Sequence, residues 1–112
     1  MMDMPTHEFG IMQERPNPGE RFDSYEPERF RCISVDDGAI EPLLHKLKQV
    51  KCYWHTLDRP EYGLAYYGIT LIPPESLNAV MEIVWHDRNL SDLLALLSEA
   101  QKEERFIIHF GI

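Results

Sequence analysis

Apolar residues recur with helical spacing in three parts of the chain. The strongest repeat consists of Leu77, Val80, Met81, Val84 and Trp85. It has the i, i+3, i+4, i+7, i+8 spacing of one helix face, and Pro73-Pro74 precedes it, where proline suits a first helical turn. Similar spacing predicts two more helices, one over Ile40–Leu47 and one from Ser91 to Ala100.

Alternating or aromatic-rich segments predict four strands, each ended by turn residues. They are Phe30–Val35, Val50–Thr56, Tyr62–Ile72 and Arg105–Phe110. The resulting order, β-α-β-β-α-α-β, resembles the split βαβ arrangement of ferredoxin-like domains with one helix added. The resemblance implies a two-layer α+β sandwich with an antiparallel sheet. Its first and last strands would be central, helices would cover one face, and the other face would be open.

The first 28 residues differ in composition from the rest. They hold seven acidic residues against Arg15 and Arg21, a net charge of −5, and four of the eight prolines. We therefore expect residues 1–28 to form an acidic, Pro-rich arm that is extended or partly disordered. Apolar residues such as Phe9 and Phe22 could anchor this arm on the body. Residues 29–112 are expected to form a single α+β domain, which the length of the chain allows.

The overall charge excludes several classes of partner. The chain has 11 Lys and Arg against 19 Asp and Glu, a net charge of −8, and its pI is about 5.0. Such a domain is a poor candidate for binding nucleic acid or anionic membranes, since both need a basic surface. The chain also lacks a long apolar run and a secretory signal. With Cys32 and Cys52 expected to stay reduced, we expect a cytoplasmic protein.

The open sheet face is the most informative feature of the predicted fold. It would carry Phe30, Leu64, Tyr66 and Ile107, an apolar patch that is unusually large for a monomer. A second copy of the chain is the cover we favour, because two-fold association buries one patch against itself. The N-terminal arm or a bound ligand are the alternatives. These four residues are therefore the candidate interface of a homodimer.

Candidate chemistry is sparse. The five histidines and two cysteines show no metal-ligand spacing such as HxH, HExxH or CxxC, so no metal site is expected. Glycine-rich nucleotide motifs are absent from the sequence, and no cofactor is expected. His109 would point onto the open face near Tyr66, and His55 would end the aromatic strand. These three are the candidate ligand-binding residues, since imidazole and phenol groups can orient a polar ligand.

The sequence favours a small non-catalytic binding or regulatory protein that dimerises through its sheet and takes a small-molecule or protein partner. One alternative is a small enzyme of the dimeric sheet-barrel type that uses His55, His109 and Tyr66. Another is an acidic inhibitor or immunity-type protein that binds a basic partner. No catalytic motif in the chain identifies a reaction.

Overall fold

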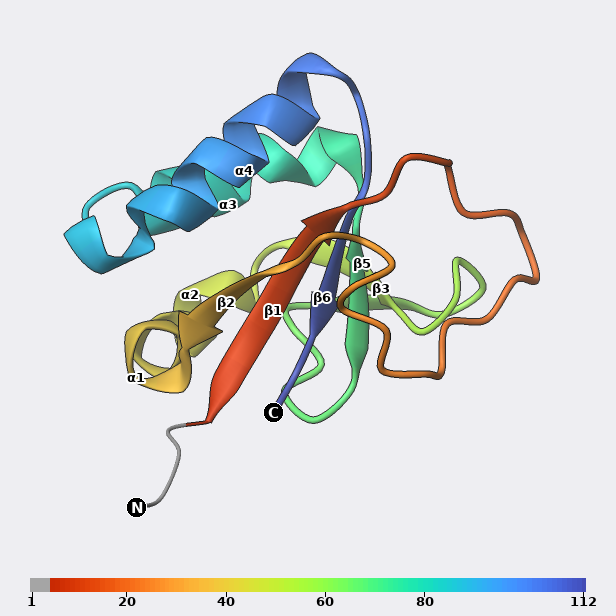
Figure 1. Cartoon of the computed structure of the whole chain (residues 1–112), viewed down its shortest axis with the longest axis horizontal. Coiled ribbons are helices and arrows are strands. Elements are labelled where there is room, and N and C mark those ends of the chain that lie inside the picture. The colour runs from red at the N-terminus through yellow and green to blue at the C-terminus, as the bar shows by residue number, and fades with distance from the viewer. Residues whose placement is uncertain (1–4) are drawn as a thin grey trace.

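The computed structural model describes residues 5–112, and residues 1–4 lie outside the described part. Figure 1 shows one sheet with helices on one side and a long irregular segment on the other. The strands are β1 (Thr6–Ile11), β2 (Ile33–Asp36), β3 (Lys51–Trp54), β4 (Pro60–Tyr62), β5 (Ile69–Ile72) and β6 (Ile107–Phe110). The helices are α1 (Asp37–Ile40), α2 (Leu44–Leu47), α3 (Leu77–Val84) and α4 (Ser91–Lys102). Short 3-10 turns at Glu41–Leu43, Pro74–Ser76 and Arg88–Leu90 lead into α2, α3 and α4.

The six strands pair antiparallel in the order β2-β1-β6-β5-β3-β4. The predicted α+β class and antiparallel sheet are confirmed, but the ferredoxin-like arrangement is not. The first predicted strand, β2, lies at an edge because β1 pairs between it and β6. The long strand predicted over Tyr62–Ile72 is instead two short strands, β4 and β5, separated by a loop over 63–68.

β1 comes from the part of the chain whose composition predicts an arm. Its residues alternate, with His7 and Phe9 fully buried on one face and Glu8 partly exposed on the other. The ordered sheet therefore begins at Thr6 and not near Arg29. Residues 1–4 of the predicted arm lie outside the described part.

The helices pack on one face of the sheet through their predicted apolar stripes. The buried helix residues are Leu77, Val80 and Val84 of α3 and Leu93, Leu97 and Ala100 of α4. Phe9, Ile72 and Ile107 of the central strands lie in the same core. Trp85, the last residue of the predicted stripe, is 59% exposed because α3 ends at Val84.

Residues 12–32, the strap, connect β1 to β2 and cover the other face of the sheet (Figure 1). Met12 and Phe22 of the strap are buried in a second core, and Phe30 and Cys32 pack beside them. The sheet residues buried in this core are Ile69, Leu71, Ile108 and Phe110. The face that the sequence predicts to be open therefore has a cover from the same chain.

The two faces of β6 are opposite to the predicted assignment. Ile107 lies in the helix-side core, whereas Phe106, Ile108 and Phe110 lie in the core beneath the strap. Both sets of side chains are apolar because both faces of the sheet are covered. Alternation alone therefore cannot predict which set faces the helices. Ile107, expected at a dimer interface, is 0% exposed.

The strap lies directly on β1 at Gly10. A Cβ at this position would be 2.6 Å from the backbone oxygen of Phe30 and 2.8 Å from the Sγ of Cys32. We expect Gly10→Ala to lower the free energy of unfolding by about 1–3 kcal/mol, because the strap must move away. Gly38→Ala is the matched control, since nothing lies within 4 Å of its Cβ position. Urea unfolding measures both variants, and equal effects would contradict this close approach.

Candidate functional site

Two buried histidines lie side by side on the central strands. His7 of β1 and His109 of β6 are both 0% exposed, and their ring centroids are 5.1 Å apart. They meet because Phe9 is the register partner of His109, which places His7 two residues further along the same face. The sequence does not pair them, because His7 belongs to the segment that composition assigns to the arm.

Hydrogen bonds extend this pair into a histidine chain of five residues: Tyr66, Asp37, His7, His109 and Thr70. His7 Nδ1 is 2.9 Å from His109 Nε2, and His7 Nε2 is 2.8 Å from Asp37 Oδ1. The Tyr66 hydroxyl donates to both Asp37 oxygens at 2.8 Å. At the other end, His109 Nδ1 is 3.1 Å from Thr70 Oγ1. The histidine chain thereby links β1, β5, β6, α1 and the 63–68 loop.

One arrangement of protons satisfies every group in the histidine chain. The backbone N–H of Ala65 donates to Thr70 Oγ1 at 2.8 Å, which leaves the Thr70 hydroxyl to donate to His109 Nδ1. His109 Nε2–H then donates to His7, and His7 Nε2–H donates to Asp37. Both nitrogens of each ring are thus used inside the protein. Neither imidazole can accept a proton from a substrate unless a bond of this chain breaks.

The histidine chain shifts three pKa values. The hydrogen bond from His7 lowers the pKa of Asp37, and the bond from Tyr66 acts in the same direction. The Asp37 carboxylate in turn raises the pKa of Tyr66 to about 12. Burial lowers the pKa of His109 well below its ordinary value, and His7 adds to the effect. At neutral pH Asp37 is therefore ionised and His109 is uncharged.

His55 lies on the strap side of the sheet, apart from the histidine chain. Its Nδ1 is 2.9 Å from the backbone oxygen of Phe22 and 3.1 Å from Asp23 Oδ1, so it fastens the strap. Of the three predicted ligand-binding residues, the structure brings Tyr66 and His109 into one hydrogen-bonded chain and leaves His55 outside it.

The four residues predicted for a dimer interface do not share a surface. Ile107 is buried in the helix-side core, and Leu64 packs against that same core. Phe30 belongs to the strap and packs on the opposite face of the sheet. Tyr66 is bound to Asp37. Of the four, Ile107 has no exposed surface to offer to a second copy, and the other three are partly exposed.

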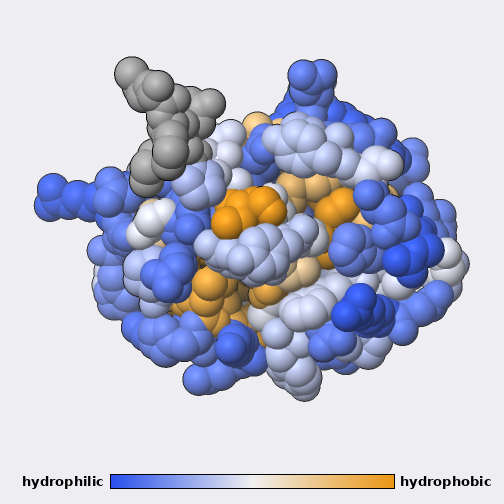
Figure 2. Space-filling view, turned by 90° about the horizontal axis from the view of Figure 1, so that it is seen from below, coloured by the Kyte–Doolittle hydropathy of each residue, from blue (hydrophilic) through white to orange (hydrophobic). Residues whose placement is uncertain are grey.

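A shallow groove of about 610 Å³ lies at the end of the sheet where β1 begins. Five large hydrophobic side chains are exposed in the described part of the chain, and three of them, Tyr25, Tyr67 and Ile112, line this tyrosine groove. Figure 2 views the molecule from below and shows hydrophobic surface near the middle of that side, framed by hydrophilic atoms. Such a concentration of exposed apolar side chains is typical of a contact surface.

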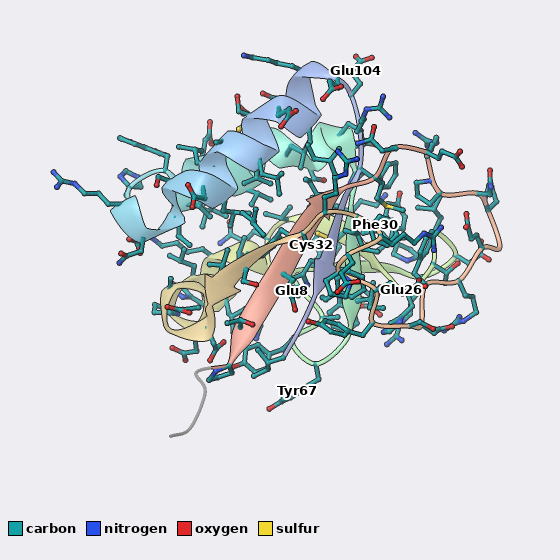
Figure 3. All side chains as sticks on the ribbon, in the orientation of Figure 1. Glu8, Glu26, Phe30, Cys32, Tyr67 and Glu104 are labelled. Atoms are coloured by element: carbon teal, nitrogen blue, oxygen red, sulfur yellow. The ribbon has the colours of Figure 1, made fainter. Side chains whose placement is uncertain are left out.

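The two carboxylates of the tyrosine groove differ in their partners. Asp23 pairs with Arg21 at 2.9 Å, so a positive charge offsets it. Glu8 accepts a hydrogen bond from the Tyr25 hydroxyl, and none of the ion pairs within residues 5–112 includes it. Partial burial raises the pKa of Glu8. Figure 3 shows Glu8 on β1 and Tyr67 at the lower edge of the molecule.

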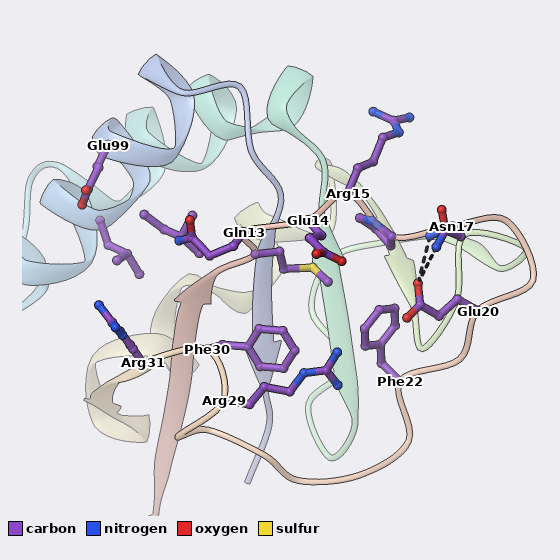
Figure 4. Close-up of a pocket in the computed structure, with 14 residues that line it drawn as sticks. Gln13, Glu14, Arg15, Asn17, Glu20, Phe22, Arg29, Phe30, Arg31 and Glu99 are labelled. Carbon is purple, nitrogen blue, oxygen red and sulfur yellow. Dashed lines mark hydrogen bonds between the residues drawn. The ribbon is translucent and has the colours of Figure 1, made fainter.

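A second hollow, of about 770 Å³, lies between the strap and α4 (Figure 4). Beside it, the Arg15 guanidinium is 5.2 Å from the ring centre of Phe106, and that of Arg29 is 4.9 Å from the ring centre of Phe30. The charged side chains of the hollow are Arg15, Arg29, Arg31, Glu14, Glu20 and Glu99. Because these charges balance, the hollow favours neither a cation nor an anion.

Comparison with protein-family models, curated proteins and solved structures finds no match for this chain. Within residues 5–112, no helix is long and apolar enough to cross a membrane. The same part of the chain holds no group of three or more His, Cys, Asp or Glu side chains placed to bind a metal ion. Burial raises the pKa of the Cys32 and Cys52 thiols to about 12, which disfavours the nucleophilic thiolate.

The sequence does not identify several residues of the histidine chain and of the tyrosine groove. The alternation of Thr6–Ile11 would have placed His7 on the same strand face as Phe9, had that segment been taken as a strand. Asp37 belongs to none of the motifs in the sequence, although its carboxylate joins Tyr66 to His7. Glu8 and Tyr25 are 17 positions apart, and no local pattern pairs them.

Proposed function

We propose that this chain is a non-catalytic binding protein that engages a basic protein partner through the tyrosine groove. The observation that carries the proposal is the groove itself, which gathers three of the five exposed large hydrophobic side chains within residues 5–112. Exposed tyrosines supply large contact areas with little loss of side-chain entropy on binding. A groove that combines them with carboxylates fits a partner with cationic side chains.

The charge of the chain supports a basic partner over a second copy. A net charge of −8 attracts a basic protein over long distances, whereas two copies repel each other. The expected homodimer through the sheet has less support, because the strap covers the face that would be shared.

The strap itself supports a binding role. Residues 12–32 hold no helix or strand, and irregular segments of this length inside a domain are uncommon and usually functional. This strap supplies Asp23 and Tyr25 to one side of the tyrosine groove, while β1 and the 63–68 loop supply Glu8 and Tyr67. The groove is thus formed by segments that are distant in sequence.

The histidine chain supports this proposal more than the small-enzyme alternative. A general base needs a ring nitrogen within reach of a substrate proton. His7 and His109 use their nitrogens within the histidine chain, and the two nitrogens of His55 face the Phe22 oxygen and the Ile69 N–H. Buried polar networks that are fully satisfied rigidify a fold, so we assign the histidine chain the role of holding Asp37 and Tyr66 behind the groove.

The proposal is tested with an arginine- and lysine-rich peptide and a matched peptide in which glutamate replaces each basic residue. We expect the basic peptide to shift the backbone NMR resonances of groove residues such as Thr6, Tyr67 and Gly68, and the acidic peptide to leave them in place. Weak attraction to an acidic protein would shift resonances over the whole surface. Shifts that are spread in this way, or equal for the two peptides, would contradict the proposal.

A further inference from the structure

Among the carboxylate side chains of the tyrosine groove, Glu8 is the one that forms no ion pair within residues 5–112. Its strand neighbours are Phe110 and Ser34, and its hydrogen-bond donor is the Tyr25 hydroxyl, which uses Oε1. The second carboxylate oxygen, Oε2, is in none of the hydrogen bonds within residues 5–112. Glu8 therefore combines a partly desolvated negative charge with an acceptor atom that it can offer to a ligand.

The aromatic rings beside Glu8 are held in place from behind. Tyr25 makes an edge-to-face contact with Phe110 at 5.5 Å between ring centres, and Tyr67 makes one with Tyr66 at 4.9 Å. Tyr67 is 81% exposed, so most of its surface is available to a partner. Rings fixed in this way lose little freedom when a ligand packs on them.

A second carboxylate, that of Asp37, lies behind the Tyr67 ring. The Tyr66 ring contacts Tyr67, and the Tyr66 hydroxyl donates a hydrogen bond to Asp37. The hydrogen bond from His7 keeps Asp37 ionised by lowering its pKa. Aromatic faces attract cations, and nearby carboxylates strengthen that attraction. The groove therefore offers a cation one direct counter-ion and a second negative charge further back.

We propose that the tyrosine groove receives an arginine side chain of the basic partner, with Glu8 as its counter-ion and Tyr25 and Tyr67 as its aromatic walls. This inference rests on the proposed function and names the group that the groove recognises. Arginine fits better than lysine, because its planar guanidinium stacks on aromatic rings while its N–H groups donate to a carboxylate. A volume of about 610 Å³ leaves room for the residues that flank the arginine.

The experiment uses a blocked glycine peptide with one central arginine and the same peptide with citrulline, which has nearly the same shape and no charge. We expect the arginine peptide to bind in the groove, as followed by NMR, and the citrulline peptide to bind about tenfold more weakly. Glu8→Gln should also weaken arginine binding about tenfold while it keeps an acceptor for the Tyr25 hydroxyl. Glu75→Gln, at an exposed carboxylate outside the groove, should leave binding unchanged.

A second pair of variants tests the aromatic walls without changing the charge. Tyr67→Ala should weaken arginine binding about threefold, whereas Tyr62→Ala, at another exposed tyrosine that lies outside the groove, should not change it. The two proposals fail differently. If the arginine- and lysine-rich peptide binds the groove but Glu8→Gln or citrulline changes nothing, this inference is overturned and the proposed function stands. If neither basic peptide binds the groove, both are overturned.

Discussion

Phe22→Ala should lower the free energy of unfolding by about 3–5 kcal/mol. Phe22 is 7% exposed and lies with Met12 in the core between strap and sheet. Its backbone N–H donates to the oxygen of His55 at 2.8 Å, and its oxygen is 2.9 Å from His55 Nδ1. Removal of the ring leaves a cavity beside the two hydrogen bonds that join the strap to His55.

Urea unfolding gives the size of this effect, and trypsin shows whether the strap comes loose. Cleavage after the exposed Arg21 should be slow in the wild-type chain and faster in Phe22→Ala. Ser24→Ala is the control, since Ser24 is exposed and lies two residues away in the same strap. If Phe22→Ala changed the stability by less than about 0.5 kcal/mol, the strap would contribute little to the fold.

The strap shows how far composition can predict structure. Four prolines and the excess of acidic residues indicate that the first 28 residues lack helices, and within residues 5–28 none is present. Composition does not show that Phe22 shares a core with Ile69, Leu71 and Ile108, which are far away in sequence. A contact of this kind depends on two segments at once, and only one of them lies in the arm.

Helices and sheet differ in how much of their arrangement is local. The stripes of α3 and α4 were predicted because each helix carries its whole apolar period within one segment. The place of β2 at an edge depends on β1, a short segment that inserts between β2 and β6. Which sheet face each side chain of β6 points to depends on the elements that cover the two faces, the helices on one and the strap on the other. The pattern of apolar residues within one segment therefore predicts neither the edge position of β2 nor the faces of β6.

The histidine chain was partly visible in the sequence. The sequence places His109 near Tyr66 on one sheet face, and the structure joins the two residues through His7 and Asp37. His7 escapes notice because it lies in the predicted arm, and Asp37 because it belongs to no motif in the sequence. The ligand-binding role of His55, Tyr66 and His109 stays a prediction. His55 lines the groove that we propose, whereas Tyr66 lies beside it and His109 does not belong to it.

Acid should destabilise this protein at the pH where an ordinary histidine begins to gain a proton. His109 titrates near its ordinary pKa of 6.5 in the unfolded chain, but its pKa lies well below that value in the folded chain. Between the two values, the unfolded chain binds a proton that the folded chain excludes. The stabilisation is therefore complete above about pH 6.5 and is lost at up to about 1.4 kcal/mol per pH unit as the pH falls.

The slope of stability against pH, between about pH 7 and pH 5, isolates this effect from that of Asp37. Asp37 also loses its stabilising effect in acid, but only below its ordinary pKa of 3.8, because His7 lowers its folded pKa. His109→Phe should reduce stability at neutral pH, since it leaves His7 and Thr70 without their partner, and should flatten the slope. His86→Gln changes an exposed histidine and should keep the wild-type slope. An unchanged slope in His109→Phe would mean that the folded chain accepts a proton at His109 as easily as the unfolded chain does. The uncharged state assigned to His109 would then be wrong.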